Sequence, residues 1–464
     1  MHWVDYGLIA LYAIAILFLG LRGRLKGRSS ASELIIGGRL LTLPAFVASL
    51  VSTWYGGILG VGEYSYRHGL SNWLVFGVPY YLAAFGFALF LAKRAREAEV
   101  LTIPDRLAQA YDKRTALAGS VIIYLMTVPA AYILMLGVLC EYLFGWPFWA
   151  AILIGTILST VYVYAGGFRS LVRIDLIQFA FMFLGFILLV IILYSRYGGL
   201  EYLRLSLPST HFTWHGGKSG WYVATWYFIA LATFVEPAFH QRCYAARNAS
   251  VARNGILISI VCWALFDFLT TTSGLYARAI LPTLSDPVAS YPALARQVLP
   301  VGVAGLFALA MLSTVTSTID SYLLISASTF GNDIVGRLFP SNEERVIRWT
   351  RVGVVTSVLL AVGLGLFFRS VIEIWQVFGS IGTPALLIPV VSAFVGRRRL
   401  PPPYALLSIL SSGGLSLVWF VSQYLTSGGD YWLGIQPIFP GLICSILLFG
   451  LFARSSLRTD RRLM

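Results

Sequence analysis

The sequence has few charged residues and no long hydrophilic stretch. Charged side chains make up 12% of its 464 residues, about half of the roughly 25% that is usual in a soluble domain. The hydrophobic fraction is 58% and the mean hydropathy is +0.77, which excludes a soluble body on a single apolar anchor. Most of the chain must therefore face lipid or pack against other apolar residues.

Other absences exclude further classes of protein. The four cysteines have no metal-ligand spacing and predict no disulfide framework. There is no phosphate-binding glycine loop, no HExxH and no zinc spacing, and the five histidines lie at predicted helix ends or in loops, so we expect no enzyme activity. The net charge of +14 is carried by short clusters between apolar segments. This pattern is typical of membrane-protein loops, and we expect no nucleic-acid binding.

Thirteen apolar segments are long enough to cross the ~30 Å hydrocarbon core of a bilayer. The first has its positive charges after the apolar run, which is typical of a spanning helix and not of a cleaved signal peptide. The fold class that we expect is all-α and integral to the membrane. The expected helices are 5–22, 43–66, 72–92, 116–144, 147–165, 171–195, 220–240, 254–281, 302–330, 347–369, 371–395, 403–424 and 433–453.

The distribution of Lys and Arg predicts the orientation. With the N-terminus outside, 27 of the 34 basic residues fall on the cytoplasmic side, including the clusters at 93–96 and 397–399. A missed helix would invert every later loop and spoil this ratio. We therefore expect an odd number of spans, an outside N-terminus and a cytoplasmic C-terminus, in a cell membrane that we take to be a bacterial inner membrane.

Two expected helices contain backbone breakers. The second carries STWYGG at 52–57, and the seventh runs into FVEP at 234–237. A broken helix at membrane depth is tolerated where the freed carbonyls face protein, water or an ion. The breaks open two blocks of five helices, 43–195 and 220–395. Five is odd, so the blocks are inverted, with helix 5–22 before them and the pair 403–453 after them in a single transporter domain. Such paired breaks indicate a binding site at the midplane, although the glycines could instead allow close packing.

The ninth expected helix is unusually rich in hydroxyl groups. Ser313, Thr316 and Ser317 are spaced i, i+3 and i+4 and so share one face. Neutral oxygen ligands of this kind suit a hard monovalent cation such as Na⁺. The alternative is that the hydroxyls bond to carbonyls of their own helix and hold helices together.

Intramembrane acids are costly and are candidates for function. Asp175 could join an ion site or pair with Arg169 or Arg173. Glu236 stands beside the second break, where it could line a cavity or bond to the broken helix. Asp267 has no partner near it in sequence and could relay a proton or stay neutral and hydrogen-bonded.

Four local patterns together resemble the sodium:solute symporter family. They are STWYGG at 52–57, AGGF at 165–168 followed by DLIQ at 175–178, EPAFHQR at 236–242, and the hydroxyl-rich run 309–321 with Asp333 beyond it. They occur in the family's order and at fitting separations. Glu236 stands where the family has Asp, Ile174 where members often have Thr, and Val51 where Ala is common.

The resemblance implies the five-plus-five inverted repeat of the leucine transporter and assigns candidate ligands. A central sodium site would use the carbonyls of Val51 and Trp54 with Ala310, Ser313 and Thr314. Positions matching a second sodium site are Asp175, Ser313, Thr316 and Ser317. Candidate solute contacts are Thr53, Tyr55, Gly56, Phe234, Glu236 and Gln376.

We therefore expect a sodium-coupled secondary active symporter that imports a small polar solute by alternating access. Sodium ions, the solute and the lipid bilayer are its expected partners, with the kind of solute, the number of sodium ions and the oligomeric state left open. The alternatives are a proton-coupled carrier on the same fold and a transporter-like receptor that binds solute without carrying it. Replacing Ser313 or Thr314 with Ala should weaken the dependence on sodium.

Overall fold

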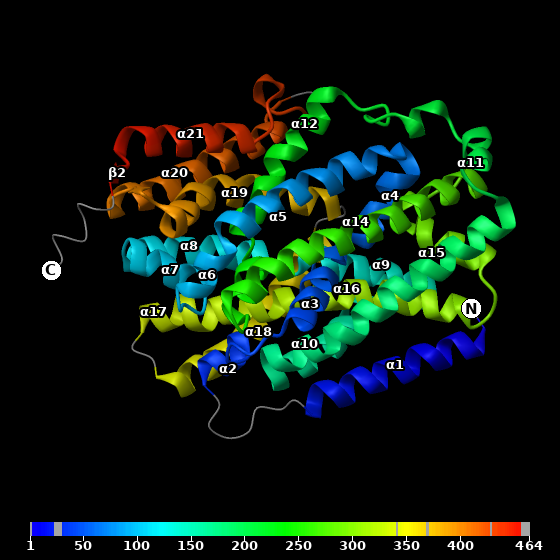
Figure 1. Cartoon of the computed structure of the whole chain (residues 1–464), viewed down its shortest axis with the longest axis horizontal. Helices are drawn as coiled ribbons and strands as arrows, with labels where there is room; N and C mark the ends of the chain where they lie inside the picture. The colour runs from blue at the N-terminus through cyan, green and yellow to red at the C-terminus, as the bar shows by residue number, and fades with distance from the viewer. Residues whose placement is uncertain (1, 23–29, 340–341, 368–370, 427–428, 456–464) are drawn as a thin grey trace.

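The computed structural model describes residues 2–22, 30–339, 342–367, 371–426 and 429–455. The described residues form a bundle of long helices that run along the long axis of the molecule (Figure 1). The final residues of the expected helix 347–369, residues 427–428 of the trailing pair and residues 456–464 lie outside this part of the chain.

A leading helix precedes the first block, as expected. It is α1 (Trp3–Arg22), and the short α2 (Ala31–Ile36) follows it. The first block begins with a broken helix and ends with a very long one. Its elements are α3 (Leu43–Trp54), η1 (Tyr55–Gly57), α4 (Ile58–His68), η2 (Trp73–Gly77), α5 (Val78–Phe90), α6 (Ala92–Glu97), α7 (Ile103–Ala110), α8 (Lys113–Thr127), α9 (Ala130–Phe144) and α10 (Phe148–Tyr197).

The 50 residues of α10 form two helices joined at Gly167, where φ is 59° and ψ is −157°. Only glycine adopts this backbone conformation readily. The chain reverses there. Leu143, just before α10, accepts a hydrogen bond from Tyr6 near the start of α1, and Ser170 donates to the Gly20 carbonyl near the end of α1. Gln178 then donates to Tyr12 in the middle of α1, so the second half runs back along it. The two halves therefore correspond to the expected helices 147–165 and 171–195.

The second block also begins with a broken helix. A connection of α11 (Leu200–Ser206) and η3 (Ser209–Phe212) leads into it. Its elements are α12 (Gly220–Ile229), η4 (Ala230–Val235), α13 (Pro237–Ala245), α14 (Ala249–Ile280), η5 (Pro287–Ala289), α15 (Ser290–Val298), α16 (Val303–Ser328), η6 (Thr329–Val335), α17 (Gly336–Leu338), α18 (Glu343–Phe367) and α19 (Val371–Val395).

Two further helices follow the second block and pack on α19. The elements are β1 (Arg398–Arg399), α20 (Pro402–Val421), η7 (Ser422–Tyr424), η8 (Trp432–Gly434), α21 (Ile438–Phe452) and β2 (Arg454–Ser455). The two short strands pair antiparallel, Arg398 with Ser455 and Arg399 with Arg454, which holds the ends of the trailing helices together.

The helices are long and apolar enough to cross a bilayer. Within the described residues, eleven helical stretches meet that requirement. One of them is α10, which spans twice, and the 15-residue apolar α21 adds one more. The thirteen expected helices are thus present. The outer side of α1 exposes Leu11, Ile14 and Phe18, each more than half accessible, as a lipid-facing surface requires.

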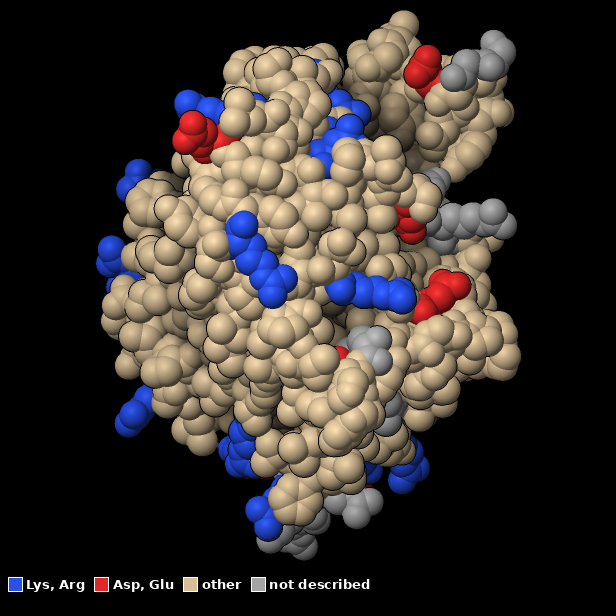
Figure 2. Space-filling view, turned by 90° about the vertical axis from the view of Figure 1, so that its right-hand side faces the viewer, with Lys and Arg blue, Asp and Glu red and all other residues tan. Residues whose placement is uncertain are grey.

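The two ends of the bundle match an odd number of crossings. The start of α1 and the strand β2 lie at opposite ends in Figure 1. Figure 2 views the end that carries α11 and α15, and most of that surface is uncharged, with scattered basic and acidic side chains. At the other end, Arg94, Arg397 and Arg398 line one groove, so two of the basic clusters noted in the sequence meet in space.

Candidate functional site

The first helix break lies between α3 and α4. The α-helix stops at Trp54, a single 3₁₀ turn follows, and the helix resumes at Ile58. Gly56 faces Thr318 of α16 so closely that a Cβ atom there would overlap the threonine side chain. The glycine is therefore needed for the approach of α16 to the break.

The second break lies between α12 and α13. Here a 3₁₀ stretch replaces the α-helix over Ala230–Val235, and Glu236 leaves the helical conformation at φ −67° and ψ 114°. Its carboxylate accepts the N–H of Ala238 at 3.3 Å and so caps α13, while Pro237 occupies the first helical position, which suits proline. Glycine and proline thus break both helices where the sequence predicts.

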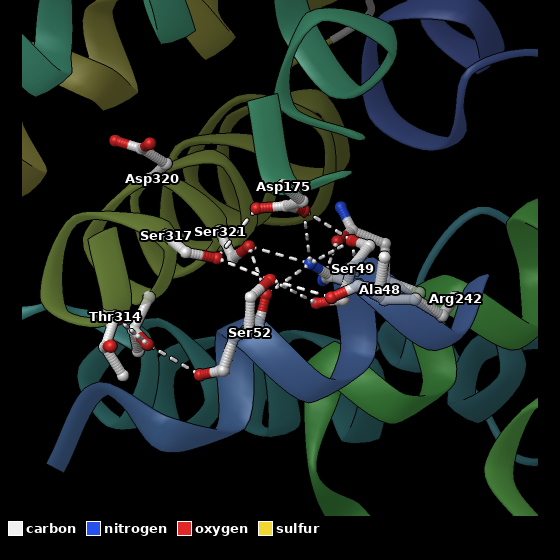
Figure 3. A network of polar contacts seen from close by, with 12 residues as sticks. Ala48, Ser49, Ser52, Asp175, Arg242, Thr314, Ser317, Asp320 and Ser321 are labelled. Carbon is white, nitrogen blue, oxygen red and sulfur yellow. Dashed lines mark hydrogen bonds and ion pairs between the residues drawn. The ribbon is translucent and has the colours of Figure 1, made fainter. Parts of the chain in front are cut away.

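Between the two breaks lies a network that we call the polar hub. It joins α3, α10, α13 and α16, and Figure 3 shows most of its side chains pointing toward one another. Its members are Ser49, Ser52, Thr53, Asp175, Arg242, Ser317, Thr318 and Ser321, all of them buried.

The hub contains one buried ion pair. Arg242 Nη2 lies 3.9 Å from Asp175 Oδ2, and both side chains are almost inaccessible. The same nitrogen donates to Ser321 Oγ at 2.7 Å and Thr53 Oγ1 at 2.8 Å. Neither partner suggested by the sequence pairs with Asp175, since Arg169 instead pairs with Glu33 at 3.4 Å.

The position of Arg242 corrects a helix boundary. The expected helix 220–240 ends too early, because α13 continues to Ala245 and carries Arg242 into the protein interior. From the sequence alone, Arg242 lies just past the end of an expected helix and is counted as one more cytoplasmic charge. Its actual partners come from three helices that are distant in sequence, α3, α10 and α16.

The hydroxyls of α16 that meet the first break are Ser317, Thr318 and Ser321. Thr318 Oγ1 donates to the Thr53 carbonyl at 2.7 Å. Ser317 Oγ lies 2.9 Å from Ser52 Oγ and 2.7 Å from Asp175 Oδ1. Hydroxyl oxygens of α16 thus lie against the carbonyl end of α3, with the Asp175 carboxylate beside them.

The hydroxyls one turn earlier make different contacts. Ser313 donates to Tyr12 of α1 at 3.0 Å, and Thr316 accepts from Gln178 at 3.0 Å. Thr314 donates to the Ala310 carbonyl of its own helix at 2.6 Å. Thr314 and Thr316 thus donate to carbonyls of their own helix, and Ser317 bonds to α3 and α10, while the assignment of these hydroxyls to sodium stays a prediction.

A cavity of about 190 Å³ lies beside the hub, between the two breaks. Of the six candidate solute contacts, Tyr55, Glu236 and Gln376 line it. The other three do not lie on its wall: Thr53 belongs to the hub, Gly56 packs on Thr318, and Phe234 packs against Phe87 of α5 with 6.5 Å between ring centroids.

Two acids line the cavity, and hydroxyls bond to both. Tyr322 Oη donates to Glu236 Oε1 at 3.0 Å. The two oxygens of Asp267 accept from Tyr55 and Tyr81. Neither partner could be seen in the sequence, because Tyr55 and Tyr81 both come from the other block.

A further buried acid went unnoticed in the sequence. Asp320 of α16 is 1% exposed, and its Oδ2 accepts from Tyr162. Its place one residue before Ser321, inside a hydroxyl-rich run, is the only signal that could have indicated it. In the described part of the chain, no group of three or more His, Cys, Asp or Glu could hold a metal ion.

Comparisons with known proteins show which family and which solved structures this chain resembles. The model of the sodium:solute symporter family matches residues 34–399. The sodium/pantothenate symporter of Escherichia coli is 25% identical over 95% of this chain and 93% of its own length, and the osmoregulated proline transporter of Bacillus subtilis is 24% identical over 95% and 92%. A solved Na⁺-coupled sialic acid symporter in a substrate-bound outward-open state superposes with a TM-score of 0.81 at 16% identity, covering 98% of this chain and 99% of that one.

Proposed function

The chain belongs to the sodium:solute symporter family, and from that premise we propose where it binds its sodium ion and its solute. It is a membrane-spanning symporter that couples the movement of a small solute to sodium. It has the inverted-repeat fold, and we propose that 43–195 and 220–395 are the two repeats. We also propose a bacterial inner membrane, because bacterial symporters are among its relatives. The Lys and Arg distribution supports an outside N-terminus and a cytoplasmic C-terminus.

We propose that sodium binds where α16 meets the first break. The carbonyls of Val51 and Trp54 would supply two ligands, as the family resemblance implies. The contact of Thr318 with the Thr53 carbonyl supports Ser317 and Thr318 as the hydroxyl ligands and Thr314 as a carbonyl ligand. This set lies one helical turn beyond Ala310, Ser313 and Thr314.

A sodium titration without any solute can show which of these two turns of α16 binds sodium. Sodium should raise the thermal unfolding temperature of the purified protein, with KCl keeping the ionic strength constant. Thr318→Val, which keeps the shape and removes the hydroxyl, should raise the half-maximal sodium concentration about 10-fold, equivalent to about 1.4 kcal/mol.

Ser313→Ala is the matched control on the same helix. Because the Ser313 hydroxyl bonds to Tyr12, this change should leave the sodium titration as in the unmodified protein. The reverse result, with Ser313→Ala weakened and Thr318→Val unaffected, would move the site back to the turn of Ala310, Ser313 and Thr314.

The second sodium site stays a prediction with mixed support. Asp175 and Ser317 share a hydrogen bond, whereas Ser313 bonds to Tyr12 of α1 and Thr316 accepts from Gln178 of α10. Arg242 already supplies a positive charge beside Asp175. We therefore propose one sodium ion per transport cycle, and uptake in proteoliposomes should depend on sodium with a Hill coefficient near one. A coefficient near two would favour the second site.

We propose that the solute occupies the cavity between the breaks, against Tyr55, Glu236 and Gln376. Uptake of a panel of radiolabelled solutes into proteoliposomes tests this. An inward sodium gradient should drive uptake, and a pH gradient in sodium-free buffer should not. Uptake that follows the pH gradient alone would favour the proton-coupled alternative.

A further inference from the structure

The cavity between the helix breaks is lined by acids without a matching base. Glu236 and Asp267 are 9% and 3% exposed, and both lie on its wall. None of the described residues on that wall is Lys, Arg or His. A carboxylate held away from water is costly unless a proton or a cation offsets its charge. The cavity therefore favours a positively charged guest.

The nearest buried cation is already paired. Arg242 is the one Arg or Lys side chain that is buried among the described residues. Its ion pair is with Asp175, and its other partners are hub oxygens such as Thr53 and Ser321. Arg242 also attracts the Glu236 carboxylate through space, but the ion pair that it forms is with Asp175, and neither cavity acid has a base in salt-bridge contact among the described residues.

The start of α13 gives a second argument about charge. In broken-helix transporters, the positive end of a half-helix can receive an anionic group of the solute. Here Glu236 caps α13 with its own carboxylate, so the chain supplies the negative group itself. A carboxylate or phosphate on the solute would face Glu236 at short range and be repelled.

The rest of the wall suits an organic cation. Aromatic rings attract cations through their π faces, and the attraction increases where water is excluded. Trp263 also lines the cavity, and its buried Nε1 has no acceptor among the described residues, so an oxygen on the solute could accept from it. The aromatic side chains on the wall are Trp54, Tyr55, Phe76, Tyr80, Tyr81, Tyr132, Trp226, Trp263, Tyr322, Trp375 and Phe378.

We propose that the solute is an organic cation, an ammonium compound with at least one oxygen acceptor, held by Asp267 and Glu236 within the aromatic wall. This inference rests on the proposed place of the solute and adds its charge and chemical class. It predicts that anions are rejected and that a neutral molecule of the same shape binds poorly.

Matched probes isolate the charge. Choline and 3,3-dimethyl-1-butanol have nearly the same shape and the same hydroxyl, but only choline is charged. Binding to the purified full-length protein in NaCl is followed by tryptophan fluorescence and by thermal shift. Ethanolamine with propan-1-ol provides a second, smaller pair. Each ammonium compound should bind at least 10-fold more tightly than its neutral partner, and pantothenate should not bind.

Variants locate the charge effect. Asp267→Asn and Glu236→Gln should each weaken binding of the ammonium probe about 10-fold while leaving the sodium-induced thermal shift in place, which also shows that the variants fold. Asp320→Asn is the matched control, since Asp320 is a buried acid that does not line the cavity.

The outcomes separate this inference from the sodium assignment. Equal binding of the charged and neutral partners, binding of pantothenate in preference to both amines, or no binding of any amine by a sodium-responsive protein would overturn the inference. Loss of the sodium response in the unmodified protein would instead count against the proposed sodium site.

Discussion

The polar hub and the cavity contain buried acids in two different situations. In the hub, Asp175 has a guanidinium 3.9 Å away and hydroxyl donors on both oxygens. In the cavity, Asp267 has two tyrosine hydroxyls and no paired base. The Asp175–Arg242 pair balances its charge within the chain, so this part of the hub should contribute mainly to stability and to the joining of helices. The cavity is complete only with a guest, so it should contribute mainly to binding.

The hub also links the two sites that transport must couple. Arg242 belongs to α13, directly after the second break, and it bonds to Thr53 just before the first break. A sodium ion beside Thr318 would therefore act on both broken helices. This provides a physical route by which sodium could preorganise the cavity for its solute.

The largest expected effect comes from removing the hub cation. Arg242→Met leaves Asp175 as a buried, unpaired charge, which typically costs about 3–5 kcal/mol. Thermal unfolding in detergent should detect the loss. The double variant Arg242→Met with Asp175→Leu removes both charges and should recover much of the stability. An unchanged unfolding temperature in the single variant would mean that the ion pair does not support the hub.

The next effect is the coupling between sodium and solute. If the hub joins the two sites, sodium should tighten the binding of the solute, and the solute must tighten sodium binding by the same factor. A coupling of about 1–3 kcal/mol is typical, or about 5–150-fold in affinity. Titrating each ligand at fixed levels of the other measures both factors. Independent binding of the two would break the proposed link through Arg242.

A smaller effect of opposite sign should appear in the cavity. Asp267→Asn removes a buried charge that has no paired base. Without solute, the free energy of unfolding should therefore be equal or higher by about 1 kcal/mol at most, and the unfolding temperature should be equal or slightly higher. The same change should weaken solute binding. Comparing the unfolding temperatures of Asp267→Asn and Arg242→Met in the absence of solute tests whether the cavity and the hub differ in this way. A large destabilisation by Asp267→Asn would put this acid in a structural role like that of Asp175.

Much of this fold could be predicted from the sequence because its signals are local. Apolar runs gave the helices, and the glycines at 56–57 and Pro237 marked both breaks. Gly167 likewise falls between two expected helices, 147–165 and 171–195, and the sequence missed only that helix continues up to the glycine on both sides.

The candidate site was harder to predict because it depends on distant partners. The pattern Ser-Thr-x-x-Ser occurs twice in α16, at 313–317 and at 317–321, and one helical turn separates them. Sequence reasoning chose the first, whereas the contacts with Thr53 and Ser52 involve the second. Asp267 likewise bonds to tyrosines that lie 186 and 212 residues away, so no local pattern could name its partners.

The smallest expected effect distinguishes two turns of one helix. Ser313→Ala removes a single hydrogen bond to Tyr12, which should cost about 1 kcal/mol or less of stability. It should leave solute binding unchanged as well as the sodium titration, because Ser313 belongs neither to the hub nor to the cavity wall. Ser317→Ala, four residues along, should weaken sodium binding because it removes a hydroxyl that contacts both α3 and Asp175. Sodium titrations that match the unmodified protein in both variants would show that the carbonyls alone carry the site and that the hydroxyls of α16 only hold the helices together.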